Sequence, residues 1–309
     1  MSSYAPSKKV KAWIEALRLR TLPLAASGVI IAAGIATLYG HFSWTLFILM
    51  LLMALCMQVL SNFADEYGDL ASGLDDESRV GPIRALQRGD ITRDEMNKAL
   101  KITSAISLGL VLLLVIASFT NTNPAGYIIF ILLGLASIFA AIAYTIGPKP
   151  YGYIGLGDIA SFLFFGIIAV IGGVYLFNHS LDLDVILPAL GLGFPTIAVL
   201  NLNNMRDAAD DKKKGKITIA NKLGNHNARL YHAVLLIASI ICFSAYLIIH
   251  NAITWWFIPM ILCFALWMYT VSIVLKVKNL KRFDKLMKPT SVTTFLVAIF
   301  FSLSLISIA

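Results

Sequence analysis

Charged side chains are scarce in this chain of 309 residues. Only 14% of its residues are Asp, Glu, Lys or Arg, while 58% are hydrophobic and the mean hydropathy is +0.79. Soluble domains carry about 25% charged residues. The deficit excludes water as the main solvent and leaves no soluble domain that could form a nucleic-acid groove, so we expect no nucleic-acid partner despite the net charge of +8.

Cysteine is also scarce, with three residues in the whole chain. Cys56, Cys242 and Cys263 each lie inside an apolar run, and no CxxC motif is present. This pattern implies neither a disulfide framework nor a zinc site, and it is typical of packing residues.

Long apolar runs dominate the sequence instead. A helix needs about 20 apolar residues to cross the hydrocarbon core, and it satisfies its backbone polar groups internally. We therefore predict an all-α membrane protein with nine transmembrane helices in a single domain, 1–309. The predicted spans are 22–39, 43–62, 101–119, 126–146, 158–177, 185–204, 229–249, 254–275 and 290–308.

Lys and Arg are absent from every second loop between these spans. The N-terminal tail and four alternate loops, with their flanks, hold all 25 basic residues, and the opposite loops hold none. The positive-inside rule then predicts a cytoplasmic N-terminus and an outer C-terminus. We expect a multi-pass protein of the cell (inner) membrane whose charged face is cytoplasmic. The four basic loops are 63–100, 147–157, 205–228 and 276–289.

An acidic cluster, SNFADEYGD, closes the second predicted span at residues 61–69. If the helix continues, Asn62, Glu66 and Asp69 are spaced by four and three residues, so their oxygens share one face, with Asp65 beside them. Crowded carboxylates need a cation, and oxygen ligands without His or Cys favour Mg²⁺. We predict a magnesium site here.

A second cluster, NLNNMRDAADD, closes the sixth predicted span at residues 201–211, with Asp207 and Asp211 four apart. A lone DxxxD at a helix end is commonplace, but two clusters on one face favour a function. Mg²⁺ usually completes its coordination with phosphate oxygens, so a diphosphate is the natural partner. The predicted metal ligands are Asn62, Asp65, Glu66, Asp69, Asp207 and Asp211.

Basic residues follow both clusters. Topology alone accounts for many of them, but arginine forks and lysine point charges also suit phosphate oxygens. After the clusters come Arg79, Arg84 and Arg88, and then Lys212, Lys213, Lys214 and Lys216.

A Pro- and Gly-rich stretch from Tyr144 to Asp158 links the fourth and fifth predicted spans. Its composition predicts a tight turn, and a turn without further function remains an alternative. The stretch also brings Tyr144 and Lys149 to the charged face. Irregular backbone at membrane depth is tolerated chiefly beside a cavity, which favours a role in the site.

Taken in order, these segments resemble the UbiA superfamily of intramembrane aromatic prenyltransferases over nearly the whole chain. SNFADEYGD, GPKPYGYIGLGD and NLNNMRDAADDKKKGKITIANKLG are similar to its menaquinone branch. The resemblance implies a helical bundle around a central cavity that is open sideways to lipid. It also implies Mg²⁺-dependent transfer from an all-trans polyprenyl diphosphate to 1,4-dihydroxy-2-naphthoate, with loss of CO₂ and diphosphate, giving demethylmenaquinone.

One departure from the family pattern affects the metal site. The superfamily has acids four and eight residues after the Asn, whereas this chain has Glu66 and Asp69 at plus four and plus seven. The menaquinone branch usually has Asn-Asp where this chain has Asp65-Glu66. Which of these two acids contacts the metal therefore stays open.

The resemblance and the residue chemistry together assign roles at the charged face. Tyr144 would face an allylic cation through its ring. The predicted catalytic residues are Asp69, Asp207, Asp211, Tyr144 and Lys149, and the predicted diphosphate ligands are Arg84, Arg88, Lys149 and Lys216.

Two alternatives remain open. A different aromatic acceptor such as 4-hydroxybenzoate would leave the metal motifs unchanged, because they recognise the shared donor. A small-molecule transporter would also suit nine spans with Gly/Pro breaks, although the ionisable residues lie at the ends of spans rather than in their middles. The prenyl chain length and the oligomeric state are not encoded in these motifs.

Overall fold

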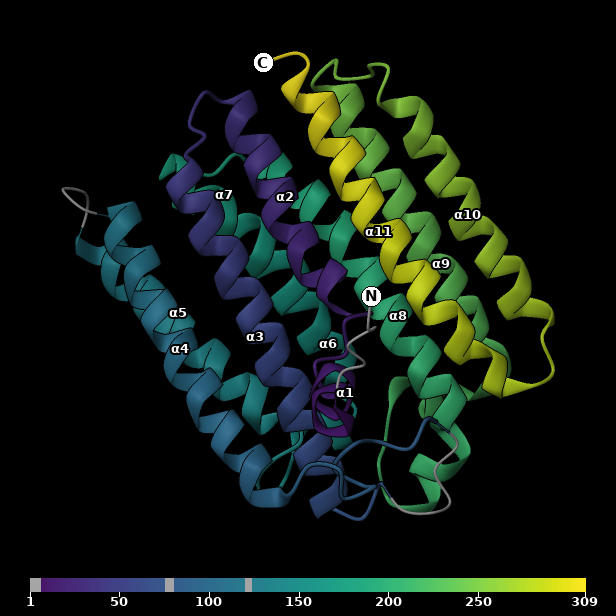
Figure 1. The fold of residues 1–309 in the computed structure, drawn as a ribbon. Coiled ribbons are helices and arrows are strands. Elements are labelled where there is room, and N and C mark those ends of the chain that lie inside the picture. Colours follow the sequence, from purple (N-terminus) through teal and green to yellow (C-terminus); the bar gives the residue numbers. More distant parts are fainter. Residues whose placement is uncertain (1–6, 76–80, 120–123) are drawn as a thin grey trace, which may run out of the picture.

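The structure is a computed structural model that describes residues 7–75, 81–119 and 124–309. Its helices run side by side along the length of the molecule (Figure 1). Among the described residues the only β pairing is an isolated bridge between Ile154 and Ile217, so the all-α prediction is confirmed. The α-helices are α1 (Lys8–Ala16), α2 (Leu22–Leu38), α3 (Trp44–Ala71), α4 (Arg93–Phe119), α5 (Pro124–Ala143), α6 (Gly157–Ser161), α7 (Gly173–Asn178), α8 (Ile186–Lys213), α9 (Ile219–Ile249), α10 (Phe257–Lys276) and α11 (Phe283–Ile306).

Eight helical segments in the described part of the chain are long and apolar enough to cross a membrane. The predicted first span coincides with α2, which is apolar but has only 17 residues. A multi-pass membrane protein is thus supported, whereas the ninth span and the orientation of the termini stay predictions.

The helices that carry the two acidic clusters continue past the predicted span ends. The helix α3 runs to Ala71 and α8 runs to Lys213, so both clusters lie on the last turns of helices, as their spacing predicts. Lys212 and Lys213 occupy the last turn of α8, where positive charge stabilises the helix dipole.

The long helix α8 lies against α9, α11 and η2, a π-helix over Phe162–Gly172 that joins α6 to α7. The crossing with η2 is close because both helices have glycine there. A Cβ on Gly166 would lie 2.7 Å from the Ala189 carbonyl oxygen, and a Cβ on Gly193 would lie 2.5 Å from the Phe162 ring. Helices α2 and α11 pack together, and α4 and α5 form a hairpin at one side beside α3 (Figure 1).

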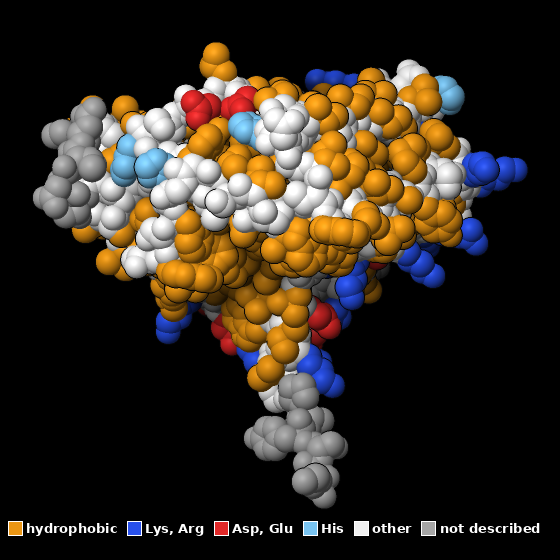
Figure 2. Space-filling view, turned by 90° about the horizontal axis from the view of Figure 1, so that it is seen from above, with side chains coloured by type: hydrophobic (Ala, Val, Ile, Leu, Met, Phe, Trp, Pro, Cys, Tyr) orange, Lys and Arg blue, Asp and Glu red, His pale blue; other side chains and the backbone are white. Residues whose placement is uncertain are grey.

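The two ends of the bundle differ in charge. Hydrophobic and uncharged side chains dominate the end that holds the C-terminus, with Lys and Arg visible mainly towards its edge (Figure 2). The acidic clusters lie at the other end, together with the loops that precede α4 and α9 (Figure 1).

Candidate active site

A cavity of about 830 Å³ opens among α2 to α8 and the start of α11. Its charged lining residues come from the cluster-bearing ends of α3 and α8, from the neighbouring loops and from Glu15 of α1, and the rest of its wall is mostly apolar. No lining residue of the described chain comes from α9 or α10, so the cavity lies to one side of the bundle. Apolar lining residues include Val29, Met50, Val111, Phe130, Ile168 and Leu176.

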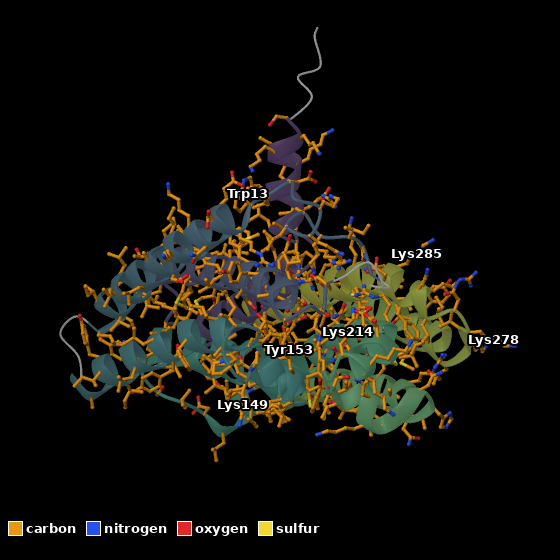
Figure 3. All side chains as sticks on the ribbon, turned by 90° about the horizontal axis from the view of Figure 1, so that it is seen from below. Trp13, Lys149, Tyr153, Lys214, Lys278 and Lys285 are labelled. Atoms are coloured by element: carbon orange, nitrogen blue, oxygen red, sulfur yellow. The ribbon has the colours of Figure 1, made fainter. Side chains whose placement is uncertain are left out.

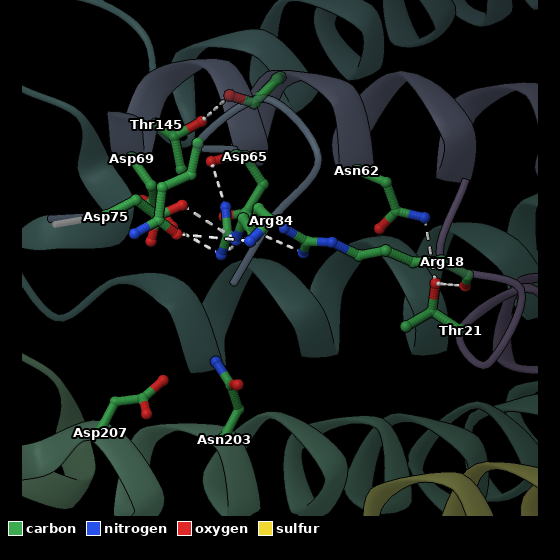
Figure 4. A network of polar contacts seen from close by, with 12 residues as sticks. Arg18, Thr21, Asn62, Asp65, Asp69, Asp75, Arg84, Thr145, Asn203 and Asp207 are labelled. Atoms are coloured by element: carbon green, nitrogen blue, oxygen red, sulfur yellow. Dashed lines mark hydrogen bonds and ion pairs between the residues drawn. The ribbon is translucent and has the colours of Figure 1, made fainter. Parts of the chain in front are cut away.

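The first acidic cluster converges on the guanidinium group of Arg84 (Figure 4). Arg84 Nη2 lies 2.9 Å from Asp69 Oδ2 and 3.3 Å from Asp65 Oδ2, and Arg84 Nε lies 3.0 Å from Asp75 Oδ2. Burial alone would lower the pKa of Arg84, but the charges of Asp69, Asp65 and Glu66 raise it. This arginine is therefore a permanent cation that balances the cluster.

The remaining polar residues of the first cluster hold neighbouring backbone. Glu66 is buried, and its Oε1 accepts a hydrogen bond from Leu86 N at 2.8 Å. The Asn62 amide donates to Leu17 O at 2.9 Å and to Thr21 Oγ1 at 3.1 Å. Both side chains line the cavity, but their present partners fix the loop before α4 and the turn before α2.

Asp65 differs from Glu66 because cations, and not backbone, surround its carboxylate. Arg18 and Arg84 both donate to Asp65 Oδ2. Arg18 adopts a left-handed backbone with φ of 48°, which is uncommon for a residue other than glycine. Of the two adjacent acids, Asp65 is thus the one already placed against positive charge at the mouth of the cavity.

The second acidic cluster is organised by Arg206, whose side chain is 1% exposed. Arg206 Nε and Nη2 donate to the two oxygens of Asp207 at 2.7 and 2.6 Å, and Nη2 also donates to Asn203 Oδ1 at 2.7 Å. Arg206 Nη1 donates to Asp284 Oδ1 of α11 at 2.6 Å. Asp207 and Asn203 lie on the opposite side of the view from the first cluster in Figure 4, and both line the same cavity as that cluster.

Tyr153, in the short 3₁₀-helix η1 (Tyr151–Tyr153), connects the two clusters. Its hydroxyl donates to Asp69 Oδ1 at 2.7 Å, and its ring lies 5.7 Å from Lys216 Nζ. Burial, followed by the charge of Asp69, raises the pKa of Tyr153, so the phenol stays a donor. Lys216 Nζ in turn lies 3.7 Å from Asp211 Oδ2.

The Lys214 side chain also connects the ends of α3 and α8. Lys214 Nζ donates to Asp210 Oδ2 and to Leu74 O, each at 2.9 Å. The segment after α8 is thereby fixed to the segment after α3.

The loop after α5 places its two predicted functional residues differently. Tyr144 lines the cavity, and burial, followed by the charges of Asp65 and Asp69, raises its pKa well above the ordinary value. Lys149 is exposed and does not line the cavity, and it lies near the edge of the molecule in Figure 3, farther out than Tyr153 and Lys214. The structure therefore does not bring Lys149 to the acidic clusters.

Of the predicted basic residues, Arg84 and Lys216 line the cavity beside the acids, and Arg88 lies at its mouth. Arg88 is already engaged by Glu15 of α1 and by Asp90, the latter at 2.8 Å. Arg79 lies outside the described residues.

The donor set at the mouth consists of oxygen atoms. No His or Cys occurs among the described residues that line the cavity, which suits a hard cation such as Mg²⁺. Within the described chain no three His, Cys, Asp or Glu side chains form a metal cage by themselves. A cation here would therefore need ligands from a bound anion or from water as well, which is the usual situation of Mg²⁺.

Sequence reasoning missed several residues of this network. Arg206 stands beside a predicted ligand, but nothing in its local sequence shows that it holds that ligand. Asp284 lies 78 residues from Arg206, so no spacing signal connects them. Tyr153 was one of three tyrosines in its loop, and only the fold selects it.

Comparison with known proteins gives consistent results. The profile of the UbiA prenyltransferase family matches residues 26–304. The 1,4-dihydroxy-2-naphthoate octaprenyltransferase of Escherichia coli (strain K12) is 44% identical over 253 residues, covering 81% of each chain. The enzyme of that name from Haemophilus influenzae is 41% identical over 261 residues, covering 81% of this chain and 80% of its own.

Two solved structures share the fold. The apo structure of a UbiA homolog from Aeropyrum pernix K1 has a TM-score of 0.65 at 17% identity, covering 93% of this chain and 96% of that one. A UbiA homolog from Archaeoglobus fulgidus bound to DMAPP and Mg²⁺ has a TM-score of 0.60 at 17% identity, covering 96% and 100%.

Proposed function

The chain belongs to the UbiA prenyltransferase family, and on that premise we propose that it transfers a polyprenyl group from an all-trans polyprenyl diphosphate to 1,4-dihydroxy-2-naphthoate. This acceptor is named for the relatives that are 44% and 41% identical. The prenylated naphthalenediol, the quinol form of demethylmenaquinone, is the product, which makes the reaction a step of menaquinone biosynthesis.

One observation carries the proposal. Two carboxylate and arginine clusters, centred on Arg84 and Arg206, face each other at the mouth of a cavity whose deeper wall is mostly apolar. A polyprenyl diphosphate has the same division, with an anionic head and a long apolar tail. Burial of the tail contributes favourable free energy, and the basic side chains at the mouth bind the head.

The oxygen donors at the mouth fit Mg²⁺. When bound, Mg²⁺ would neutralise negative charge on the diphosphate as it leaves. Arg84, Arg88 and Lys216 would assist on the diphosphate oxygens. The proposed metal ligands come from both clusters: Asn62, Asp65, Glu66, Asp69, Asp207 and Asp211.

The chain's own residues account for the rest of the reaction. The bond between C1 of the prenyl group and the diphosphate oxygen breaks, and its electron pair leaves with the diphosphate. The neutral phenol of Tyr144 lines the cavity, where its ring face can stabilise the allylic cation. The naphthoate carbon that bears the carboxylate then bonds to C1, and CO₂ leaves while its bonding electrons restore the aromatic ring.

We place this chemistry on the cytoplasmic side of the cell (inner) membrane. The concentration of all 25 basic residues in alternate segments supports a cytoplasmic N-terminus, an outer C-terminus and nine spans, with α2 counted as a short span. The clusters then lie at the cytoplasmic ends of α3 and α8.

The test is a product assay. Purified protein in bilayers receives geranylgeranyl diphosphate, Mg²⁺ and 1,4-dihydroxy-2-naphthoate carrying ¹³C in its carboxylate. We expect prenylated naphthalenediol by mass spectrometry, together with equal amounts of ¹³CO₂ and diphosphate. Parallel reactions offer 4-hydroxybenzoate. A product formed only with 4-hydroxybenzoate would show that this acid, and not 1,4-dihydroxy-2-naphthoate, is the acceptor. Movement of solute across the bilayer without diphosphate release would indicate the transporter alternative instead.

A further inference from the structure

Two carboxylates outside the acidic clusters share an arginine with a cluster aspartate. Asp75 Oδ2 lies 3.0 Å from Arg84 Nε, while Nη2 of the same guanidinium lies 2.9 Å from Asp69 Oδ2. Asp284 Oδ1 accepts from Arg206 Nη1 at 2.6 Å, while Nε and Nη2 of that guanidinium bind Asp207. Both halves of the site therefore contain an arginine between an inner and an outer carboxylate.

Burial makes these arrangements sensitive to charge. The side chains of Arg206 and Asp75 are each 1% exposed, and that of Arg84 is 10% exposed. Removing the counter-charge of a buried ion is strongly destabilising, because protein and not water then surrounds the remaining charge. Each of these arginines therefore needs a carboxylate at all times.

Metal binding changes that balance. A cation held by Asp69 or Asp207 would compete for the carboxylate oxygens that now accept from Arg84 or Arg206. The guanidinium group would then lie close to a second positive charge and would lose some of its hydrogen bonds to the aspartate. Asp75 for Arg84 and Asp284 for Arg206 would then supply a carboxylate that keeps the guanidinium neutralised and in place.

We propose that Asp75 and Asp284 are positioning residues that hold Arg84 and Arg206 when Asp69 and Asp207 turn to the metal. They act through the arginines, and by keeping them neutralised they raise the metal affinity of the inner aspartates. The inference rests on the proposed function, because it requires a metal at these clusters. Arg20 Nη1 lies 3.2 Å from Asp284 Oδ1, which ties this carboxylate to the segment between α1 and α2 as well.

Mn²⁺ is the probe, titrated into purified full-length protein without diphosphate and followed by electron paramagnetic resonance. Asp284→Asn should weaken Mn²⁺ binding about 10- to 100-fold, the usual range for partners that act behind a metal ligand. Asp284→Glu keeps the charge and should restore most of the affinity. Asp184→Asn is the matched control, since Asp184 pairs with His250 and does not line the cavity.

A double variant separates positioning from mere structural support. If Asp284→Asn weakens Mn²⁺ binding because the charge of Arg206 is no longer neutralised, Arg206→Gln in the Asp284→Asn background should recover Mn²⁺ affinity. A structural role predicts a double variant that binds no better than Asp284→Asn. Asp75→Asn, alone and with Arg84→Gln, repeats the test in the other half, and size-exclusion profiles confirm that each variant is folded.

Unchanged Mn²⁺ affinity in both Asp284→Asn and Asp75→Asn would overturn the inference while leaving the proposed function intact. Failure of both double variants to recover affinity would also overturn it. If the wild-type protein bound no Mn²⁺ at all, the metal assignment of the proposed function would fall, and the inference with it.

Discussion

Gly68→Ala is the most direct perturbation of the contact between the first cluster and the loop after α5. Gly68 precedes Asp69 on α3, and a Cβ at this position would lie 2.5 Å from Thr145 O and 2.6 Å from Thr145 Cβ. Ordinary contact begins at 3.4 Å, and the nearest obstacle is backbone, so the loop must move away. The Thr145 hydroxyl also donates to Ala64 O at 2.7 Å, and we expect the shift to break this hydrogen bond.

The size of the effect follows from two opposing terms. Overpacking of a close contact costs about 1–3 kcal/mol, and the better helix propensity of alanine returns about 1 kcal/mol. The net change in the free energy of unfolding is therefore small, at most about 2 kcal/mol. Catalysis should suffer more, because the same displacement pulls the Tyr153 hydroxyl from Asp69, a bond to a charged group worth about 1.5–3 kcal/mol.

The assay measures thermal unfolding of the purified protein and the steady-state kinetics of diphosphate release. We expect Gly68→Ala to lower kcat/KM roughly tenfold or more, since about 1.4 kcal/mol corresponds to a factor of ten. Gly109→Ala on α4 is the control, because a Cβ there meets nothing within 4 Å. Wild-type kinetics in Gly68→Ala would refute the claim that this contact sets the geometry of the site.

Further tests address single groups in the site. Tyr153→Phe should lower kcat about 10- to 100-fold through loss of the hydrogen bond to Asp69. Tyr151→Phe loses only a hydrogen bond to a backbone carbonyl and should lower kcat much less. Equal effects in the two variants would contradict the special role of Tyr153. Asp207→Asn should abolish product formation while leaving membrane insertion intact, and full activity at saturating Mg²⁺ would remove Asp207 from the metal site. Lys149→Ala tests the role predicted from the sequence: because Lys149 is exposed and away from the cavity, we expect an unchanged KM for the diphosphate substrate, and a raised KM would restore that role. Chelation of divalent cations should stop turnover reversibly, and Mn²⁺ or Mg²⁺ should restore it; activity that survives chelation would exclude the metal-assisted step.

Local pattern was enough to predict much of the fold. Apolar length located the helices, because a segment in lipid has few conformations open to it. The spacing of Asn62, Glu66 and Asp69 was correctly interpreted as helical, and α3 does continue through Ala71. Such features depend on residues within one or two turns of each other, which a sequence displays directly.

The partners of the acids could not be predicted in this way. Arg206 pairs with Asp284, and Tyr153 pairs with Asp69 from 84 residues away, so tertiary packing alone brings them together. Lys149 illustrates the difficulty. Its charge led to the prediction that it binds diphosphate, but in the fold Lys149 is exposed and Tyr153 is the residue of this loop that contacts Asp69. A hydrogen bond from Ile217 N to Tyr153 O, at 2.8 Å, fixes Tyr153 in this position, and no local motif encodes it.

The close crossing of η2 and α8 has a consequence for how the protein handles substrates of different length. With Gly166 and Gly193 in contact, that wall of the cavity has no slack to give. The helix α5 also lines the cavity, and only 6% of its apolar segment is buried inside the protein, so in a bilayer its outer surface would contact lipid tails. The cavity can therefore widen more easily at α5 than at η2 to accommodate a longer prenyl chain. The thickness and fluidity of the surrounding bilayer would then help to determine which chain lengths the enzyme accepts.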